Sequence, residues 1–311
     1  MTQSPSSNIR PFVSREEWLA KRQARRDRQR EQNIARAAQM HEARLAQAAS
    51  PTKLATPKLS TYYVGCSGWF YWHWRDRFYP TGSKTSEWFT HYAKKFHTVE
   101  LNAPFYAWPT VGTVMTWKKQ SGRRRFVYTV KASELITHVR RFSRTSELVK
   151  DFCHIADLLG LAMGCFLFQL PPSFKYSRAR LTRIVAQLDP RHRNVVEFRH
   201  RSWWNATVFA AFRERGIIFC SCSGPRLPDV LVTTAEDVYI RFHGTKKWYR
   251  HDYTQEELRV WADRVEDAKP ARVWAYFNND RDGFAIKNAR SFLRLLCDGA
   301  EGRSGRGNVC E

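Results

Sequence analysis

Several sequence patterns that assign proteins to common classes are missing here. A transmembrane helix needs about 18 consecutive apolar residues. No uninterrupted apolar stretch approaches this length, so no transmembrane segment is expected. No G-x-G-x-x-G turn follows the first expected strand, which leaves a dinucleotide-binding domain without support. Residues 65–68 read Gly-Cys-Ser-Gly and do not form the G-x-S-x-G nucleophile motif. The H-x-H and H-E-x-x-H spacings of many zinc enzymes are also absent.

The seven cysteines form no C-x-x-C pair. Their number is odd and no secretory signal is evident, so we expect free thiols and a cytoplasmic location. Cys220 and Cys222 stand two residues apart and offer a possible metal chelate, although a pair of buried strand residues is the favoured interpretation.

Positive charge and aromatic side chains are abundant instead. The formal net charge is +23, and 14% of the residues are aromatic, including 12 tryptophans. Residues 1–58 contribute +7, so the rest of the chain carries +16. This balance favours anionic partners such as nucleic acid, phosphorylated metabolites or an acidic membrane surface. We therefore expect an anionic ligand, with nucleic acid among the candidates; the sequence indicates no oligomeric state.

Composition divides the chain into three parts: a basic N-terminal extension and linker (1–60), a body (61–298) and a flexible tail (299–311). Residues 14–17 form a capping-box pattern, and good helix formers without a continuous apolar stripe follow them to Ala49. This predicts a solvated basic helix or a disordered arm. A contact with nucleic acid or membrane, a targeting segment and a start-site artefact all remain open for it.

Between residues 61 and 298 the chain alternates strand and helix patterns. Expected strands cover 62–66, 97–101, 125–131, 163–170, 193–198, 217–221, 238–243 and 272–278. Expected helices cover 85–96, 110–120, 144–160, 177–188, 204–215, 254–267 and 285–297. The alternation predicts a (β/α)₈ TIM barrel with long irregular loops at its C-terminal face, and 222–237 is expected to lack a helix. A doubly wound open sheet is the alternative.

Polar residues stand where almost every expected strand ends, and these ends converge in a barrel. Burying many polar groups together is costly unless they bind one another or a ligand, so they define a candidate site. We expect catalytic roles for Glu100, Lys131, Glu197 and His243. Substrate-binding roles are expected for Ser67, Trp69, Asn102, Tyr106, Gln169, Arg199, His200, Arg241 and Asn278. Purely structural pairing of Glu197 with Arg199, and of Glu100 with Lys131 or Arg241, is the alternative.

The same strand ends carry a family resemblance. The stretches GCSGWFYWHWRDRFYP, FHTVELNAPFY, VKASELITH, FQLPPSFKY, EFRHRSW, YIRFHG and YFNND, spread over 65–280, resemble the YecE-like family (domain of unknown function 72). The resemblance implies a TIM barrel over 61–298, without implying a particular reaction. Where family members commonly read V-E-I-N-S-T-F-Y, this chain has Ala103 and Pro104 in place of two hydroxyl residues.

Three chemistries fit these residues. A divalent Zn²⁺, Mn²⁺ or Mg²⁺, for which Glu197, His200 and His243 are the candidate ligands and Glu100 and Asp280 further candidates, would activate water for hydrolysis. Without metal, Glu100 and Glu197 would form the acid–base pair of a glycosidase or isomerase, or Lys131 would act as a base or Schiff-base amine.

The third possibility is a non-catalytic nucleic-acid binder whose loops combine cations with aromatic rings. For Trp69, Trp72 and Trp74 as a group, packing within the loop is favoured over ligand stacking. The leading hypothesis from sequence is an enzyme with hydrolase or lyase chemistry on an anionic substrate, with nucleic-acid-derived compounds among the candidates, and with or without metal assistance.

Overall fold

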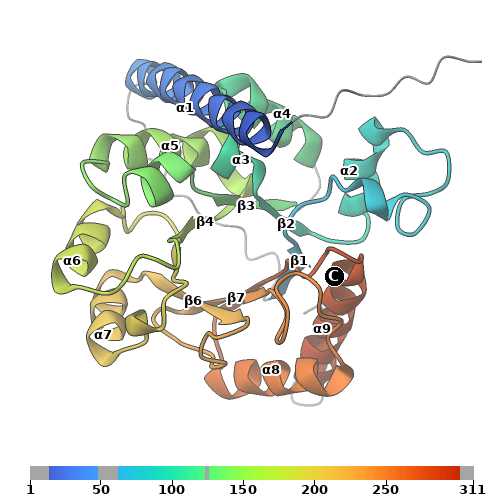
Figure 1. The fold of residues 1–311 in the computed structure, drawn as a ribbon. Helices are drawn as coiled ribbons and strands as arrows, with labels where there is room; N and C mark the ends of the chain where they lie inside the picture. The colour runs from blue at the N-terminus through green and yellow to red at the C-terminus, as the bar shows by residue number, and fades with distance from the viewer. Residues whose placement is uncertain (1–13, 48–61, 123–125, 302–311) are drawn as a thin grey trace, which may run out of the picture.

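The computed structural model describes residues 14–47, 62–122 and 126–301. Eight parallel strands curl into a barrel with helices around its outside (Figure 1), which confirms the predicted (β/α)₈ architecture. The strands are β1 Tyr62–Cys66, β2 Thr98–Leu101, β3 Val127–Lys131, β4 Met163–Gln169, β5 Asn194–Glu197, β6 Ile218–Ser223, β7 Asp237–Phe242 and β8 Arg272–Phe277. Each lies within two residues of its predicted bounds, because buried strands of parallel sheets are nearly continuous apolar runs.

Helices follow the predicted order. They are α1 Arg15–Ala46, α2 Trp88–Ala93, α3 Ala103–Tyr106, α4 Val111–Ser121, α5 Ser146–Leu159, α6 Arg178–Gln187, α7 Ala206–Arg215, α8 Gln255–Ala268 and α9 Phe284–Glu301. The β6–β7 connection forms turns without a helix, as its glycine and prolines predict. Short elements in the loops were not predicted, among them the single turn of α3 and a π-helix, η3 Leu135–Val139, between β3 and α5.

The sheet runs in the order β1-β8-β7-β6-β5-β4-β3-β2, so its two edge strands are consecutive in the chain. At this seam, described strands β1 and β2 share no main-chain ladder. The Tyr92 hydroxyl joins them: it accepts from the Cys66 amide at 2.9 Å and donates to the Thr98 carbonyl at 3.0 Å. A Cβ on Gly65 would lie 2.5 Å from that carbonyl oxygen, so the strands approach this closely because Gly65 has no side chain.

The barrel interior is filled by side chains at its N-terminal end. Tyr63 stacks on Trp274 with ring centroids 4.0 Å apart, and Val127, Leu167 and Ile218 complete a buried cluster with them. Burying each of these side chains contributes about 1.5–3 kcal/mol to the stability of the fold, relative to leaving it exposed to water. Because these rings occupy one end of the barrel, the polar residues of the strands collect at the other.

Helix α1 docks on α5 through its C-terminal half only. The Asn33 side chain donates to the Tyr106 carbonyl and accepts from the Trp108 amide, each at 2.9 Å, and Ala37 and Met40 are buried. The prediction of a solvated helix is therefore wrong for this half. The docked face uses an amide, small residues and ion pairs in place of a continuous apolar stripe, so hydrophobic periodicity did not reveal it.

Within the described part of the chain, no helix is both long and apolar enough to cross a membrane. Cys66, Cys153, Cys165, Cys220 and Cys222 are free and buried, as predicted. Cys297 is disulfide-bonded, so the expectation of free thiols is wrong at this position.

Candidate functional site

The C-terminal ends of the strands bring the predicted polar residues together. Glu100 from β2, Glu197 from β5 and Arg241 from β7 are all buried. The Arg241 guanidinium lies between the two carboxylates, with Nη2 2.5 Å from Glu100 Oε1 and Nη1 2.6 Å from Glu197 Oε2. The carboxylates therefore share one cation across the barrel interior. Both predicted structural pairings, Glu100 with Arg241 and Glu197 with Arg199, are present.

Further donors complete the coordination of the carboxylates. Glu100 accepts from the Ser67 hydroxyl at 2.8 Å and from the Tyr239 hydroxyl at 2.6 Å. Burial alone would raise the pKa of Glu197, but the charges of Arg199 and Arg241 more than reverse this and leave its pKa well below the ordinary value. Glu197 thus stays ionised as a hydrogen-bond acceptor and is a weak base.

His243 connects this network to the loop after β7. Its Nε2 lies 2.9 Å from Nη2 of Arg199, and its Nδ1 lies 3.4 Å from the Asn278 amide nitrogen. Burial and the nearby charges of Arg199 and Arg241 hold the His243 pKa well below its ordinary value, so the neutral ring accepts a hydrogen bond from Arg199. The Arg199 guanidinium also stacks on Trp248, 4.5 Å from the ring centroid. Trp248 stood among the loop aromatics of the sequence but was not predicted to support the site.

Lys131 differs from the other cations of the site. Its Nζ lies 4.1 Å from the centroid of the Phe105 ring, and no hydrogen bond or ion pair from the described residues reaches it. Burial and the positive charge of Arg241 lower the Lys131 pKa to about 7, although Glu197 and Glu100 act in the opposite direction. A large fraction of these amines is therefore neutral at neutral pH, and 9% of the residue's surface is exposed.

The sequence matches the family model described as "Protein of unknown function DUF72" over residues 63–306, which spans the barrel and most of the chain. The chain belongs to the DUF72 family. The match confirms the resemblance carried by the strand-end motifs.

Relatives of this DUF72 chain match about three quarters of it and nearly all of their own length. It is 28% identical over 273 residues to the UPF0759 protein YunF of Bacillus subtilis, covering 75% of this chain and 94% of YunF. A crystal structure of a DUF72 family protein from Thermotoga maritima is 27% identical, with a TM-score of 0.69 over 76% of this chain and 99% of that one. A DUF72 protein from Enterococcus faecalis, 18% identical, shares the fold with a TM-score of 0.65 over 76% of this chain and 95% of its own.

The π-helix of this DUF72 barrel places His138 beside Lys131. The imidazole makes an edge contact with the same Phe105 ring, with ring centroids 4.8 Å apart, and its Nδ1 lies 2.9 Å from the Thr137 hydroxyl. Burial and the Lys131 charge lower the His138 pKa to about 4, so the ring is neutral at neutral pH. His138 was not among the predicted site residues, although it ends the VKASELITH motif. π-Helical turns often occur at functional sites.

Two predicted residues bond within their own loops and do not join the central network. His200 Nδ1 accepts from the Ser202 amide at 3.2 Å and lies 2.8 Å from its hydroxyl, so it caps the short helix Arg201–Trp203. Gln169 donates to the Leu170 carbonyl at 2.9 Å. Both side chains serve their own loops, although Gln169 pairs with Glu197 in the sheet register.

The loops after β1 and β2 contribute both buried and exposed groups. Asn102 donates to the Ser67 carbonyl at 3.1 Å, and its own buried side-chain oxygen lacks a hydrogen-bond partner. Trp69 is half-buried against Phe89, whereas Tyr106 is 62% exposed. Asn102 thus offers a free acceptor in the site, and Tyr106 an aromatic ring at its rim.

A divalent metal fits this donor set poorly. Glu197, Cys222 and His243 place ligand atoms within 4.8 Å of one another, while His200 is absent from this group because it caps its own loop. Glu197 already pairs with two guanidinium groups, and His243 accepts from one of them. A cation here would face two arginines, and their repulsion opposes binding. Asp280, a further predicted ligand, accepts from the Trp74 indole at 2.9 Å instead.

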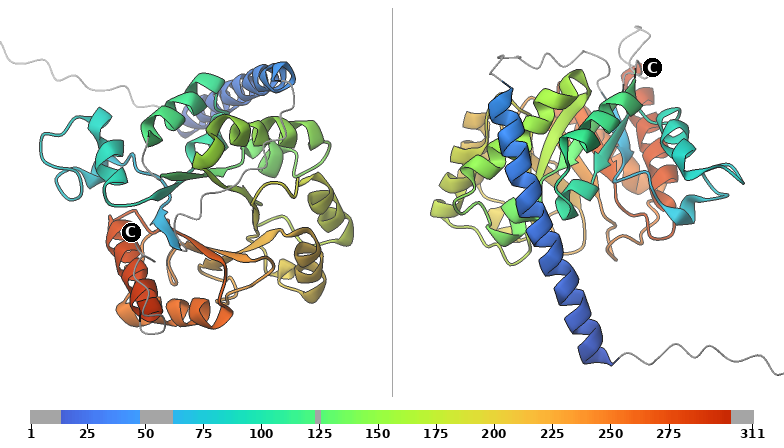
Figure 2. Two further views of the ribbon diagram at one scale, coloured as in Figure 1. Left: turned by 180° about the vertical axis from the view of Figure 1, so that it is seen from behind. Right: turned by 90° about the horizontal axis from the view of Figure 1, so that it is seen from above.

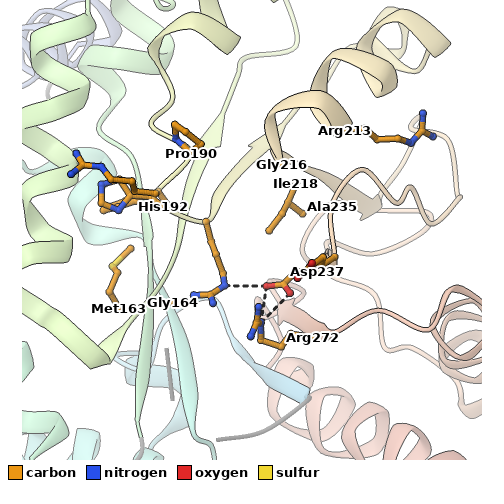
Figure 3. Close-up of a pocket in the computed structure, with 14 residues that line it drawn as sticks. Met163, Gly164, Pro190, His192, Arg213, Gly216, Ile218, Ala235, Asp237 and Arg272 are labelled. Atoms are coloured by element: carbon orange, nitrogen blue, oxygen red, sulfur yellow. Dashed lines mark hydrogen bonds and ion pairs between the residues drawn. The ribbon is translucent and has the colours of Figure 1, made fainter. Parts of the chain in front are cut away.

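A cavity of about 440 Å³ lies at the opposite end of the barrel, where the strands begin. Figure 3 shows its central ion pairs: Asp237 accepts from Arg193 at 3.1 Å and from Arg272 at 3.0 Å. The Trp274 indole donates to the same carboxylate at 3.0 Å. This carboxylate is shared by three donors, so we attribute the cluster to stabilisation of the barrel, as is usual for this face.

Proposed function

We propose that this protein is a lyase that forms a covalent imine between Lys131 and an anionic carbonyl substrate. The observation that supports the proposal is the Lys131 amine, which is buried, has no ion-pair partner among the described residues and has a pKa of about 7. A lysine that loses its proton near neutral pH is an effective nucleophile toward aldehydes and ketones. Its place at the C-terminal face is the usual place of TIM-barrel active sites.

The reaction begins when the neutral Lys131 nitrogen attacks the carbonyl carbon. A C–N bond forms, and the carbonyl oxygen leaves as water after it takes up protons. The resulting iminium accepts the electron pair of the Cα–Cβ bond: the β-hydroxyl gives its proton to a neighbouring base such as neutral His138, the β carbon leaves as an aldehyde or ketone, and an enamine remains on Lys131. Protonation of the enamine at its α carbon then regenerates an imine, and water hydrolyses it to release the second product and the free amine. No redox partner is required.

The neighbouring groups divide the supporting tasks. Arg199 has 10% of its side chain exposed at the site, which suits it to pair with the substrate anion. Glu100 and Glu197 position the two arginines, and neutral His138 is suited to accept or relay protons. The unpaired acceptor of Asn102 would orient a hydroxyl or amide of the substrate.

This assignment fits the geometry better than the alternatives. A glycosidase mechanism needs one carboxyl group with a raised pKa, whereas the pKa of Glu197 is depressed and Glu100 accepts from three donors. A metal-assisted hydrolase would place its cation beside Arg199 and Arg241. We therefore assign Glu197 and Glu100 to positioning roles and Lys131 to the chemical step.

The test is reductive trapping. The full-length protein is incubated at pH 8 with glyoxylate, pyruvate, glyceraldehyde 3-phosphate or ribose 5-phosphate in the presence of sodium cyanoborohydride, and adducts are mapped by peptide mass spectrometry. At least one carbonyl should label Lys131, and Lys131→Met should abolish that label. Lys175→Met, an exposed lysine on the same barrel face, is the matched control and should keep it.

Labelling confined to exposed lysines, or no label on Lys131 with any of the four compounds, contradicts the proposal. Trapping that depends on added Zn²⁺ or Mn²⁺ and disappears with a chelator would instead favour the metal-assisted alternative.

A further inference from the structure

The N-terminal half of α1 is a basic helix that projects from the body. Every residue from 15 to 28 is exposed, and Figure 2 shows this half extending beyond the barrel. The ten residues 21–30 contain Lys21, Arg22, Arg25, Arg26, Arg28 and Arg30 against the single acid Asp27. At about 1.5 Å rise per residue they form a cationic rod about 15 Å long. The protein itself neutralises little of this charge, which leaves it available to a polyanion.

The projecting helix lies on the same side as the candidate site. Asn33, at the point where α1 leaves the body, is bonded to Tyr106 and Trp108, which follow the C-terminal end of β2. In Figure 2 the helix extends away from the barrel on the side opposite the end of α9. The cationic segment therefore stands beside the face at which Lys131 lies.

A second cationic segment continues this surface across the barrel. The loop after η3 exposes Arg140, Arg141 and Arg144, while the buried Phe142 anchors it. Arg141, Phe142 and Arg144 all have positive φ, at 49°, 60° and 53°. Such strain in non-glycine residues is retained where the surrounding structure fixes it, often at functional sites. Arg30 and Arg140 line one groove of about 460 Å³ and so connect the two segments.

Exposed aromatic rings accompany these cations on the same face. Phe70 and Trp72 follow β1, Tyr106 follows β2 and Tyr249 follows β7. Each of the four is at least 42% exposed. Trp74 is buried in its loop as predicted and Trp69 packs on Phe89, whereas Trp72 touches Phe70 and Trp88 at its edge and stays 60% exposed. Arg75 lies 5.7 Å from the centroid of the Trp72 ring. Exposed rings beside arginines suit the stacking of unpaired bases.

We propose that the exposed half of α1, the loop Arg140–Arg144 and the aromatic rings of this face form a binding surface for single-stranded nucleic acid. The arginines contact phosphates, and the rings stack on bases, which a duplex would keep inside. An anionic membrane is the less suitable polyanion, because residues 21–30 have no apolar side chain larger than alanine and only Trp18 and Leu19 are large exposed apolar residues in the rest of 15–28, too few for an apolar face that inserts. This surface is independent of any reaction at Lys131.

The experiment measures fluorescence anisotropy of a labelled 20-nucleotide DNA strand with the full-length protein between 50 and 300 mM NaCl. Wild type should bind more tightly to the single strand than to its duplex. The triple variant R25Q/R26Q/R28Q should bind at least tenfold more weakly at 100 mM NaCl, with a shallower salt dependence. Glutamine has a helix propensity close to that of arginine. Circular dichroism of the variant verifies that its helix content is unchanged.

The matched control is K95Q/R213Q/R215Q, which removes three charges from exposed residues of α7 and the segment after α2, away from this face. It should change affinity less than twofold. Equal loss in both triple variants, a preference for the duplex, or absence of binding at 50 mM NaCl would overturn the proposal. Binding to vesicles of 30% phosphatidylserine, lost in the same α1 variant, without binding to the oligonucleotide would also overturn it.

Trp72→Ser should weaken single-strand binding about tenfold without changing its salt dependence.

Discussion

Both ends of the barrel contain carboxylates paired with arginines, but the arginines differ in their exposure to solvent. At the N-terminal end, Asp237 pairs with Arg193 and Arg272, whose side chains each remain 22% exposed to water. At the C-terminal end, Arg241 is 1% exposed and pairs with Glu100 and Glu197, which are fully buried. The first network reaches solvent, and the second is sealed within the protein.

If the proposed chemistry takes place at Lys131, cavity size alone does not locate it. The cavity of about 440 Å³ surrounds a carboxylate that three donors already satisfy. Lys131 lies beside the sealed network, and its burial, together with the charge of Arg241, lowers its pKa to about 7. Depressed lysine pKa values and unpaired buried polar groups are the features that reactive sites require.

The largest expected effect concerns stability. Arg241→Met leaves Glu100 and Glu197 buried without their common cation and should lower the free energy of unfolding by about 3–5 kcal/mol. Asp237→Asn should cost less, about 1.5–3 kcal/mol, because Arg193 and Arg272 reach water. Urea unfolding monitored by circular dichroism measures both. Equal losses would remove the distinction between a sealed and an open network.

The pH dependence of stability should identify Lys131. Its pKa is about 7 in the folded protein against an ordinary value of 10.5, so between these values the unfolded chain keeps a proton that the native state has released. Stability should therefore rise with pH across this window relative to Lys131→Met, by up to about 1.4 kcal/mol per pH unit. Urea unfolding of both proteins at pH 6, 7, 8 and 9 provides the difference. Parallel curves would mean that native Lys131 titrates as an ordinary lysine.

A smaller effect is expected from the ring beneath the amine. Phe105→Leu removes the aromatic face that favours the protonated form of Lys131, at 4.1 Å in the wild type. The midpoint of the trapping rate against pH should fall by about half a unit, which corresponds to roughly 0.7 kcal/mol of lost cation–π interaction. Met115→Leu, an exposed apolar residue of α4, serves as the control. A midpoint that rises would show that the ring acts mainly by excluding water.

The smallest effect should come from the N-terminal face. Arg213→Gln changes an exposed residue that lines the cavity of Figure 3 and should alter stability by less than about 0.5 kcal/mol. Trapping at Lys131 should be unchanged within error. A substantial loss of trapping in this variant would indicate that the two ends of the barrel are coupled.

Much of this organisation was predictable from the sequence because it follows from strand periodicity. The positions of Glu100, Lys131, Glu197 and Arg241 at the ends of apolar strands place them on one face of any parallel barrel. Which of them pair was only partly predictable, since Glu100 and Arg241 are 141 residues apart and their contact depends on the closure of the sheet.

The loops were less predictable because their side chains can bond within the loop. His200 had the residue type and location of a site residue, yet it caps the turn that begins beside it. His138 was missed because it lies in a π-helical turn, Leu135–Val139, which the periodicity of the sequence does not predict. The docking of α1 was also missed, since Asn33 reaches backbone groups of a loop more than 70 residues away.

The seam between β1 and β2 has a consequence for motion within the barrel. Each of these strands has a ladder on one side only, and the Tyr92 hydroxyl provides the bridge on the other. Opening that bridge exposes the Cys66 amide without disturbing the other seven strand pairs. The Cys66 amide should therefore exchange its hydrogen through a local opening of the barrel that costs less free energy than global unfolding. This opening would lie next to Ser67, whose hydroxyl donates to Glu100.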